Sequence, residues 1–462
     1  MTSPAERHAL VGAFVARPAA PWFGDADRRV VRRAMLDTLA VAVAATADPL
    51  AAVLAGCRTE ADRHGAARLW SPGGRADAER AAFINGAIAH ALDYDDAAPA
   101  WRGHPSAVML PALFALRAAQ EMPLDRIAGA YGVGFELAAA LGAALGEAHY
   151  QRGWHATATV GVLAAAAAGA NLLGFAPPVV AHALGLAAAQ AAGLQANFGT
   201  TAKAAHAGFA AAAAVRALRL AAAGFEASDG ALFGPGGYLA LYGEGGDGQA
   251  LAALGTTPPA VRRSGIEAKL YPMCYGAHRA VAAALDLAAA GVAPEAIERV
   301  EVIGSRSAHA ALRPDWPDTG AAARFSGAYG VAAALIDGGV GLGSFTDAAV
   351  ARPAVAALMA RITLREEDGP RLPRLARVVV HLRDGSTVER RVAALPGRMD
   401  EDAVEDSLRR KAADCLRWAG HAEGADALAA LVLDDPGATV GGVLDALPPW
   451  PGAEGRAGAY DV

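Results

Sequence analysis

The sequence predicts a mainly α-helical protein with a smaller α+β domain inserted into the chain. Three observations support this class. Apolar residues recur at helical spacing over about the first 250 residues without strand-like alternation, strand patterns begin beyond Thr256, and helical spacing returns after Asp400. We therefore expect a helical domain at residues 1–262, an α+β domain at 263–398, and a C-terminal segment at 399–462 that packs back on the helical domain.

The expected helices of the N-terminal part are interrupted by glycine and proline clusters. In the first of them, residues 27–46, Val31, Met35 and Leu39 recur at a spacing of four and form one apolar stripe. The same kind of pattern predicts further helices at residues 81–92, 107–120, 124–145, 159–173, 178–191 and 203–223.

One uncharged stretch, residues 156–177, is long enough to resemble a membrane span of about 20 residues. Most of it is alanine and glycine, and neither an aromatic belt nor a basic flank marks a membrane interface. We therefore interpret it as a central helix of an alanine-rich bundle, in which small residues let neighbouring helices approach closely.

The middle of the chain carries strand and hairpin signals. Residues 298–304 alternate valine with charged residues, and the Asp-Gly pair at 384–385 lies between two alternating runs. That pair predicts a hairpin with a type I′ turn. We expect helices between these strands at residues 277–290 and 324–337, and we expect Asp400 to cap the helix that follows.

Composition limits the partners that the protein can have. Hydrophobic residues make up 54% of the 462 residues, which suits a large buried core, and the length predicts about two or three domains. A net charge of -6 gives no reason to expect nucleic acid or a membrane, so an anionic substrate would need a local basic pocket. Three widely spaced cysteines fit a reducing cytoplasm and offer no metal cluster, and we expect no signal peptide.

The lysines are informative because only three of the 41 basic residues are lysine. A buried lysine, unlike arginine, can release its proton, so a retained lysine is a candidate for proton transfer. Lys411 lies on the polar side of an amphipathic pattern and is expected on the surface. Lys203 lies in a stretch without other charges and Lys269 precedes an apolar segment, so both are candidate catalytic residues, with retention by chance as the alternative.

Four histidines lie at or near the start of a helical stretch, namely His104, His155, His206 and His278. The start of a helix has free N–H groups and a partial positive charge, which attract a carboxylate. We expect one anion pocket built from these histidines, with separate positions as the alternative. His90 lies on an apolar helical face and is interpreted as a core histidine.

Acidic and phenolic side chains complete the set of candidates. Asp93, Asp95 and Asp96 stand where a helix is expected to end, so they either terminate that helix or orient a histidine or lysine. Tyr150 and Tyr329 are potential acids or hydrogen-bond donors, and the alternative for Tyr329 is a core position. Glycine-rich runs do not have Walker or Rossmann spacing and GxSxG is absent, which predicts loops there.

Six ordered blocks resemble the MmgE/PrpD family, which includes 2-methylcitrate dehydratase, cis-aconitate decarboxylase and iminodisuccinate epimerase. The blocks are INGAIAHALDYDD, GHPSAVMLPALFAL, RGWHATATVGVLAAAA, GTTAKAAHAG, KLYPMCYGAH and ARFSGAYGVAAALIDG. The resemblance covers nearly the whole chain. It implies a large helical domain with an inserted α+β lid, a homodimer, and action on small di- or tricarboxylates with neither a metal nor an organic cofactor.

The resemblance also implies the residues of the site. The proposed catalytic residues of the decarboxylase branch match Asp93, His104, His155, Lys203, Lys269 and Tyr329 of this chain. We expect His206, His278 and Tyr150 to contact the substrate. A threonine follows the aspartates in the decarboxylase motif, and Ala97 stands at that position here.

The expected chemistry is proton movement at a carbon next to a carboxylate. Lys203 and Lys269 would hold substrate carboxylates and stabilise the charge of an enolate. A neutral base moves the proton, with His155, Lys203 and Tyr150 as candidates. In a dehydratase, His104 or Tyr329 would protonate the departing hydroxyl. Because dehydration is the common assumption for the family, we expect a hydro-lyase acting on a 2-methylcitrate-like hydroxy-acid. Decarboxylation and epimerisation need nearly the same residues and stay open, and a binding protein with a decayed site is a further alternative.

Overall fold

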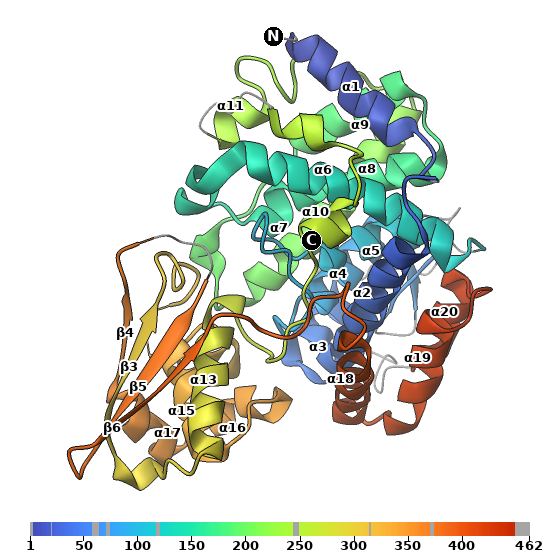
Figure 1. Ribbon diagram of the computed structural model, residues 1–462. Helices are drawn as coiled ribbons and strands as arrows, with labels where there is room; N and C mark the ends of the chain where they lie inside the picture. Colours follow the sequence, from blue (N-terminus) through green and yellow to red (C-terminus); the bar gives the residue numbers. More distant parts are fainter. Residues whose placement is uncertain are drawn as a thin grey trace.

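The fold is mainly α-helical, which confirms the predicted class (Figure 1). The computed structural model describes residues 3–19, 21–57, 64–70, 74–116, 121–243, 249–313, 316–369 and 374–448. The α-helices are α1 (Pro4–Ala16), α2 (Asp25–Ala44), α3 (Pro49–Gly56), α4 (Ala78–Ala89), α5 (Ser106–Ala115), α6 (Leu124–Gln151), α7 (Ala156–Thr159), α8 (Gly161–Leu173), α9 (Pro177–Ala188), α10 (Thr201–Ala222), α11 (Tyr238–Tyr242), α12 (Ala260–Arg263), α13 (His278–Ala289), α14 (Gly320–Ala323), α15 (Gly327–Asp337), α16 (Asp347–Val350), α17 (Pro353–Met359), α18 (Val404–Trp418), α19 (Ala425–Leu433) and α20 (Val440–Ala446). The strands are β1 (Ala67–Arg68), β2 (Arg75–Ala76), β3 (Ile297–Gly304), β4 (Ile362–Glu366), β5 (Ala376–Leu382) and β6 (Thr387–Val392).

The helices predicted in the N-terminal part all occur, with ends that differ by a few residues. The predictions correspond to α2, α4, α5, α6, α8, α9 and α10. Residues 117–120 of the predicted helix 107–120, and residues 244–248 of a glycine-rich run, lie outside the described residues. The short ladder of β1 and β2 was not predicted, because two residues per strand leave no alternation to detect.

Helix α8 forms the centre of the helical part and contacts α5, α6, α9 and α10. Its alanines and glycines let these neighbours come close. A Cβ at Gly134 of α6 would lie 2.4 Å from the carbonyl oxygen of Ala164 in α8, so only glycine fits there. The packing agrees with the interpretation of this stretch as a central bundle helix, with a short break at Val160 between α7 and α8.

Two described stretches are long and apolar enough to cross a membrane by length and composition alone. They are α6 and residues 156–173, and their apolar windows are 78% and 94% buried against the rest of the protein. A bent pair, residues 25–47 with 49–56, passes the same test when it is counted as one span. The burial of α6 and α8 gives their apolar surface a protein partner.

Helices α4 and α10 cross at two glycines, and this crossing positions the candidate site. A Cβ at Gly86 of α4 would lie 2.9 Å from the Cα atom of Gly208 in α10. Because the helices approach so closely, the end of α4 at His90 comes next to Lys203 in the first turn of α10. Residues more than 100 positions apart in the sequence thus become neighbours.

The smaller part is a four-stranded sheet with helices on one face (Figure 1). The strand order is β4-β3-β5-β6, in which β3 and β4 run parallel and the other pairs antiparallel. Helices α13 and α15 pack on the buried face and form with it a hydrophobic cluster of their own. Strand β4 was not predicted, because residues 362–366 mix apolar and charged residues over only five positions.

The hairpin between β5 and β6 is present, but the predicted type I′ turn is wrong. A type I′ turn needs positive φ at both central residues, and here Gly385 has a φ of 87° while Asp384 does not lie in that region. The amide of Gly385 donates to the carbonyl of Leu382, and Leu382 pairs with Ser386 across a three-residue loop. This is the loop form in which glycine alone adopts the left-handed conformation.

The C-terminal segment packs against α2, with α18 and α19 beside it in Figure 1. Helix α18 begins at Val404 rather than after Asp400, because Asp400 accepts hydrogen bonds from Arg398 and does not cap the helix. Lys411 is buried, so the surface prediction is wrong. Its Nζ lies 2.7 Å from Oδ1 of Asp37 in α2.

Candidate active site

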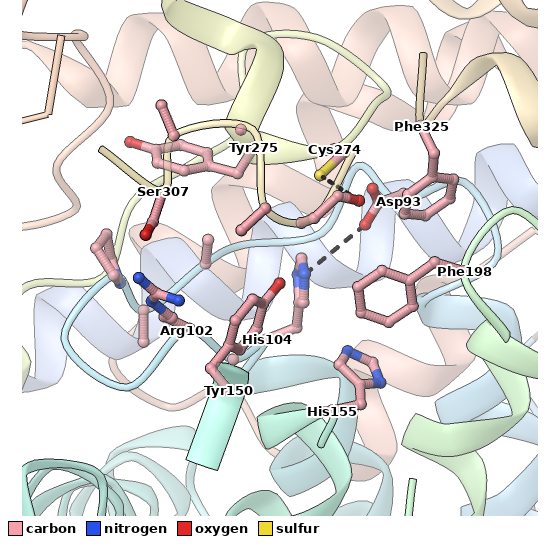
Figure 2. A pocket seen from close by; sticks show the side chains of 18 of the residues that line it. Asp93, Arg102, His104, Tyr150, His155, Phe198, Cys274, Tyr275, Ser307 and Phe325 are labelled. Atoms are coloured by element: carbon pink, nitrogen blue, oxygen red, sulfur yellow. Dashed lines mark hydrogen bonds and ion pairs between the residues drawn. The ribbon is translucent and has the colours of Figure 1, made fainter. Parts of the chain in front are cut away.

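A pocket lies where the helical part meets the smaller part (Figure 2). Including its open mouth, it encloses about 640 Å³ of space that protein atoms leave empty. The polar and aromatic side chains that line it are Asp93, Arg102, His104, Tyr150, His155, Phe198, Lys203, Cys274, Tyr275, Ser307, Phe325 and Arg374.

Asp93 lies at the centre of a buried charge cluster. Its Oδ1 atom lies 2.6 Å from Nζ of Lys203 and 2.7 Å from Nζ of Lys269, which also donates to the Asp93 carbonyl. A bridge between Ala97 and Glu267 places Lys269 beside the Asp93 loop. Burial alone would raise the pKa of the Asp93 carboxyl, but the two ammonium groups hold it well below its usual range.

A hydrogen-bonded chain connects Lys203 to a second carboxylate. Nδ1 of His90 lies 2.9 Å from both oxygens of Asp95, and Nε2 lies 2.8 Å from Nζ of Lys203. The carboxylate accepts from Nδ1, so Nε2 of the neutral ring accepts from the lysine. Burial, with the charge of Lys203, lowers the pKa of His90 to about 3, although Asp95 opposes this shift. His90 is buried as predicted, but it belongs to this charge network rather than to an apolar core.

His104 presents an unprotonated nitrogen to the pocket. Its Nδ1 lies 2.9 Å from the carbonyl oxygen of Asp96, which can only accept, and 3.3 Å from a carboxylate oxygen of Asp95. Burial and the charge of Lys269 lower the pKa of His104, so the ring is neutral with its proton on Nδ1. Nε2, which lies 3.7 Å from Oδ1 of Asp93, therefore has a free lone pair and can act as a base.

His155 has the opposite tautomer. Nδ2 of Asn197 donates to Nε2 of His206 over 3.3 Å, so the proton of His206 is on Nδ1. That Nδ1 lies 3.0 Å from Nδ1 of His155 and donates to it, which leaves His155 with its proton on Nε2. Burial and Lys203 lower the pKa of both rings, that of His206 to about 4. The pocket thus contains a base, His104, and a neutral donor, His155.

The structure brings most of the expected site residues together. Tyr150 lines the pocket, where burial raises the pKa of its hydroxyl. His278 lies behind the lining, in contact with the ring of Tyr275, and its Nε2 donates to the carbonyl of Met273. Tyr329 does not line the pocket. It lies in the hydrophobic cluster of the smaller part, where its hydroxyl donates to the carbonyl of Ser344.

Arg102, Arg374 and Ser307 line the pocket, and the sequence predicted none of them. Backbone conformation marks two of these residues. Among the described residues, only three that are not glycine have positive φ, namely Asp93 (49°), Arg102 (56°) and Ser307 (61°), and all three line this pocket. Such strain concentrates at functional sites and has no signature in residue spacing.

The side chains around Asp93 also resemble a set of metal ligands. Four donor atoms lie within 4.8 Å of one another, on His90, Asp93, Asp95 and His104. Lys203 already donates to Nε2 of His90 and to Asp93, and Lys269 donates to the same carboxylate. A divalent cation would have to displace or lie against two ammonium groups, so the arrangement favours lysine over a metal ion.

Comparison with known proteins places the chain in one family. Residues 14–250 match the MmgE/PrpD N-terminal domain, and residues 271–435 match the MmgE/PrpD C-terminal domain. The chain belongs to the MmgE/PrpD family. Both matched regions contribute to the pocket, since Asp93, His104 and Lys203 lie in the first and Tyr275 and Arg374 in the second.

Curated relatives of this family member are cis-aconitate decarboxylases. The human enzyme is 29% identical over 362 residues, which cover 73% of each chain. The Aspergillus terreus enzyme is 30% identical over 357 residues, 70% of this chain and 72% of its own. A cis-aconitate decarboxylase-like protein, oryM of Aspergillus oryzae, is 32% identical over 367 residues, 72% of this chain and 74% of its own.

Proposed function

We propose that the protein is a lyase that acts on a small di- or tricarboxylate in the pocket around Asp93, without a metal or an organic cofactor. One observation carries this proposal. Two buried lysines converge on one carboxylate beside two neutral histidines of opposite tautomer. Cations excluded from water stabilise charge that develops on a carboxylate far better than they would in solvent.

Decarboxylation is the reaction that we propose first, because the similar curated proteins are named for it. The bond between the substrate carbon and its carboxyl group breaks, and the electron pair stays on the carbon while carbon dioxide leaves. The ammonium group of Lys203 stabilises the enolate and gives its proton to that carbon. Burial lowers the pKa of Lys203 against the effect of Asp93, which brings its acidity closer to neutral pH.

Dehydration of a 2-methylcitrate-like hydroxy-acid is the second candidate. The opposite tautomers of His104 and His155 favour dehydration, because this reaction needs a base and a proton donor at the same time. Nε2 of His104 would remove a proton next to a carboxylate, and Nε2–H of His155 would protonate the departing hydroxyl. This assignment makes His104 the base and His155 the acid, whereas the sequence named His155 among the candidate bases and His104 among the candidate acids.

Incubation with a panel of polycarboxylates in deuterium oxide, followed by NMR, tests the proposed function. Release of carbon dioxide with deuterium on the product supports decarboxylation, and a new alkene signal with loss of water supports dehydration. Deuterium uptake without net change would indicate epimerisation. Absence of exchange and turnover with every member of the panel would refute all of these reactions.

Two variants connect the reaction to the pocket. Lys203→Ala is expected to reduce kcat by about 10²- to 10⁴-fold, because it removes the cation that stabilises the enolate and donates the proton. His381→Gln is a matched control, since His381 lies on β5 of the sheet, contacts Glu301, and is outside the pocket. Equal loss of activity in both variants would indicate damage to the fold rather than a role in the reaction.

A further inference from the structure

The pocket has cationic side chains in two separate places. Nζ of Lys203 lies 5.6 Å and 5.2 Å from the ring centres of Phe198 and Phe325, close to Asp93. Figure 2 shows Arg102 on the other side of the pocket from these two rings, beside Tyr150. The only carboxylate among the described lining residues is Asp93, and it is held by lysines.

Arg102 lies in a hydrogen-bonded loop of the helical part. The amide of Ala98 donates to the carbonyl of Gly103 and closes a tight turn around Arg102, whose φ is positive. Trp101 of this loop packs directly against Gly142 of α6. A Cβ added at Gly142 would lie 2.2 Å from the Cβ of Trp101, so only glycine allows this contact. The guanidinium carbon of Arg102 lies 4.5 Å from the ring centre of Tyr150, a cation–π contact that fixes its direction.

Arg374 reaches the same region from the smaller part, just before β5. Both arginines line the same pocket as Tyr150. Burial raises the pKa of the Tyr150 hydroxyl, and the positive charges of Arg102 and Arg374 act against this rise. The phenol remains protonated and can donate a hydrogen bond. Arg374 also interacts electrostatically with Glu267, whose carboxylate accepts from Tyr275 and does not line the pocket.

We infer that Arg102 and Arg374, with the hydroxyl of Tyr150, form a second carboxylate-binding subsite that holds the carboxylate of the substrate farther from Lys203. The inference rests on the proposed function and names the residues that bind the second carboxylate of its substrate. Guanidinium groups bind carboxylates through paired N–H donors, and a phenol adds one more donor. The site therefore selects acids with at least two carboxylates, because a monocarboxylate fills only the Lys203 end. One arginine comes from each part of the protein, so the bound carboxylate joins the two parts.

Binding of unreactive acids, measured by isothermal titration calorimetry, tests this subsite. The probes are propane-1,2,3-tricarboxylate, glutarate and butyrate. Arg102→Gln and Arg374→Gln are each expected to weaken binding of the tricarboxylate and of glutarate by about 10- to 100-fold, the effect of removing a hydrogen bond to a charged group. Binding of butyrate should stay as in the parent protein, and the double variant should lose less than the product of the two single effects.

Arg279→Gln is the matched control. Its guanidinium also stacks on a tyrosine, 5.5 Å from the ring centre of Tyr275, but it does not line the pocket. Thermal melting of each variant shows whether it folds, and since the arginines lie in different parts, each tests the subsite independently. Unchanged affinity for the tricarboxylate in both pocket variants would overturn the inference.

The outcomes separate this inference from the proposed function. If Lys203→Ala weakens binding of every probe while the arginine variants do not, the proposed function stands and the second subsite is wrong. If the parent protein binds none of the polycarboxylates, both are wrong. If all three probes lose affinity equally in Arg102→Gln, the arginine acts on any anion through its long-range charge. The inference that it binds a second carboxylate directly then also fails.

Discussion

Nζ of Lys203 lies 2.8 Å from Nε2 of His90, and both side chains are buried. The imidazole accepts a hydrogen bond from the ammonium group because Asp95 holds its other nitrogen as the donor. Lys203 thus contacts a carboxylate on one side and a neutral acceptor on the other. This pairing fixes the position of the ammonium group in the pocket and stabilises its charged form.

Replacement of His90 tests this relationship. His90→Leu removes an acceptor from a buried ammonium group, so the pKa of Lys203 should fall further. The loss of activity at basic pH should therefore begin at a lower pH than in the parent protein. We expect kcat/KM at neutral pH to fall by about 10- to 100-fold. The pH profile of kcat/KM is the measurement. His90→Gln keeps an acceptor and should recover part of the activity, and an unshifted profile in His90→Leu would contradict the pairing.

Substitution of Lys203 by arginine separates charge from proton transfer. Lys203→Arg keeps a positive charge but provides a group that does not release its proton, and its larger head must fit between Phe198 and Phe325. We expect a loss of about 10²- to 10⁴-fold in kcat, similar to Lys203→Ala. Steady-state kinetics on the substrate found in the panel measures it. Near-parent activity of Lys203→Arg would exclude Lys203 as the proton donor.

The buried histidines make stability depend on pH below neutrality. Burial lowers the pKa of His90 and of His278 to about 3, while an unfolded histidine titrates near 6.5. Between these values the unfolded chain binds protons that the folded chain does not. The free energy of unfolding should therefore be highest above pH 6.5 and fall by about 1.4 kcal/mol per pH unit for each such group as the pH drops towards 5.

Urea denaturation at pH 7, 6 and 5 measures this slope. His278→Phe should make it shallower, because one group that binds a proton only in the unfolded chain is gone. His278→Phe also loses the hydrogen bond to the carbonyl of Met273, so the stability of the variant at each pH is compared with its own stability at pH 7. A slope that does not change between the parent protein and this variant would show that His278 gains its proton without unfolding.

The ion pair of Lys411 and Asp37 is expected to be sensitive to loss of one partner. Lys411→Met leaves the Asp37 carboxylate buried without its cation and should reduce the free energy of unfolding by about 3–5 kcal/mol. The double variant with Asp37→Asn should be more stable than Lys411→Met. Chemical denaturation of the four proteins gives the coupling energy, and a loss below about 1 kcal/mol in Lys411→Met would show that the pair is solvated.

Chelation is expected to leave activity unchanged. The ammonium groups of Lys203 and Lys269 contact the carboxylate that a cation at His90, Asp93, Asp95 and His104 would need. Dialysis against EDTA, followed by activity assay and metal analysis by mass spectrometry, measures this. Loss of activity that added divalent metal restores would show that the cluster binds a metal in place of lysine contacts.

Several features of the site could be predicted because they depend on residue type. The rarity of lysine singled out Lys203 and Lys269, and both prove to be buried in contact with Asp93. Lys203 lines the pocket, whereas Lys269 reaches Asp93 without lining it. Histidines at helix starts pointed to His104 and His155, which line the same pocket. The prediction that Lys411 lies on the surface was wrong, because an amphipathic pattern cannot show that α18 packs against an acidic residue of α2.

The sequence by itself determined the mainly helical class, the helices of the N-terminal part and the residue types that can move a proton, because local periodicity and side-chain chemistry are properties of short segments. Only the tertiary structure decided that His90 contacts Lys203 and that Arg102 and Arg374, from different parts of the protein, line the same pocket. These neighbours come from distant segments, and their approach depends on close contacts such as Gly86 against Gly208. The tautomers of His104 and His155 were also decided there, because each depends on which acceptor or donor the packed chain places beside the ring.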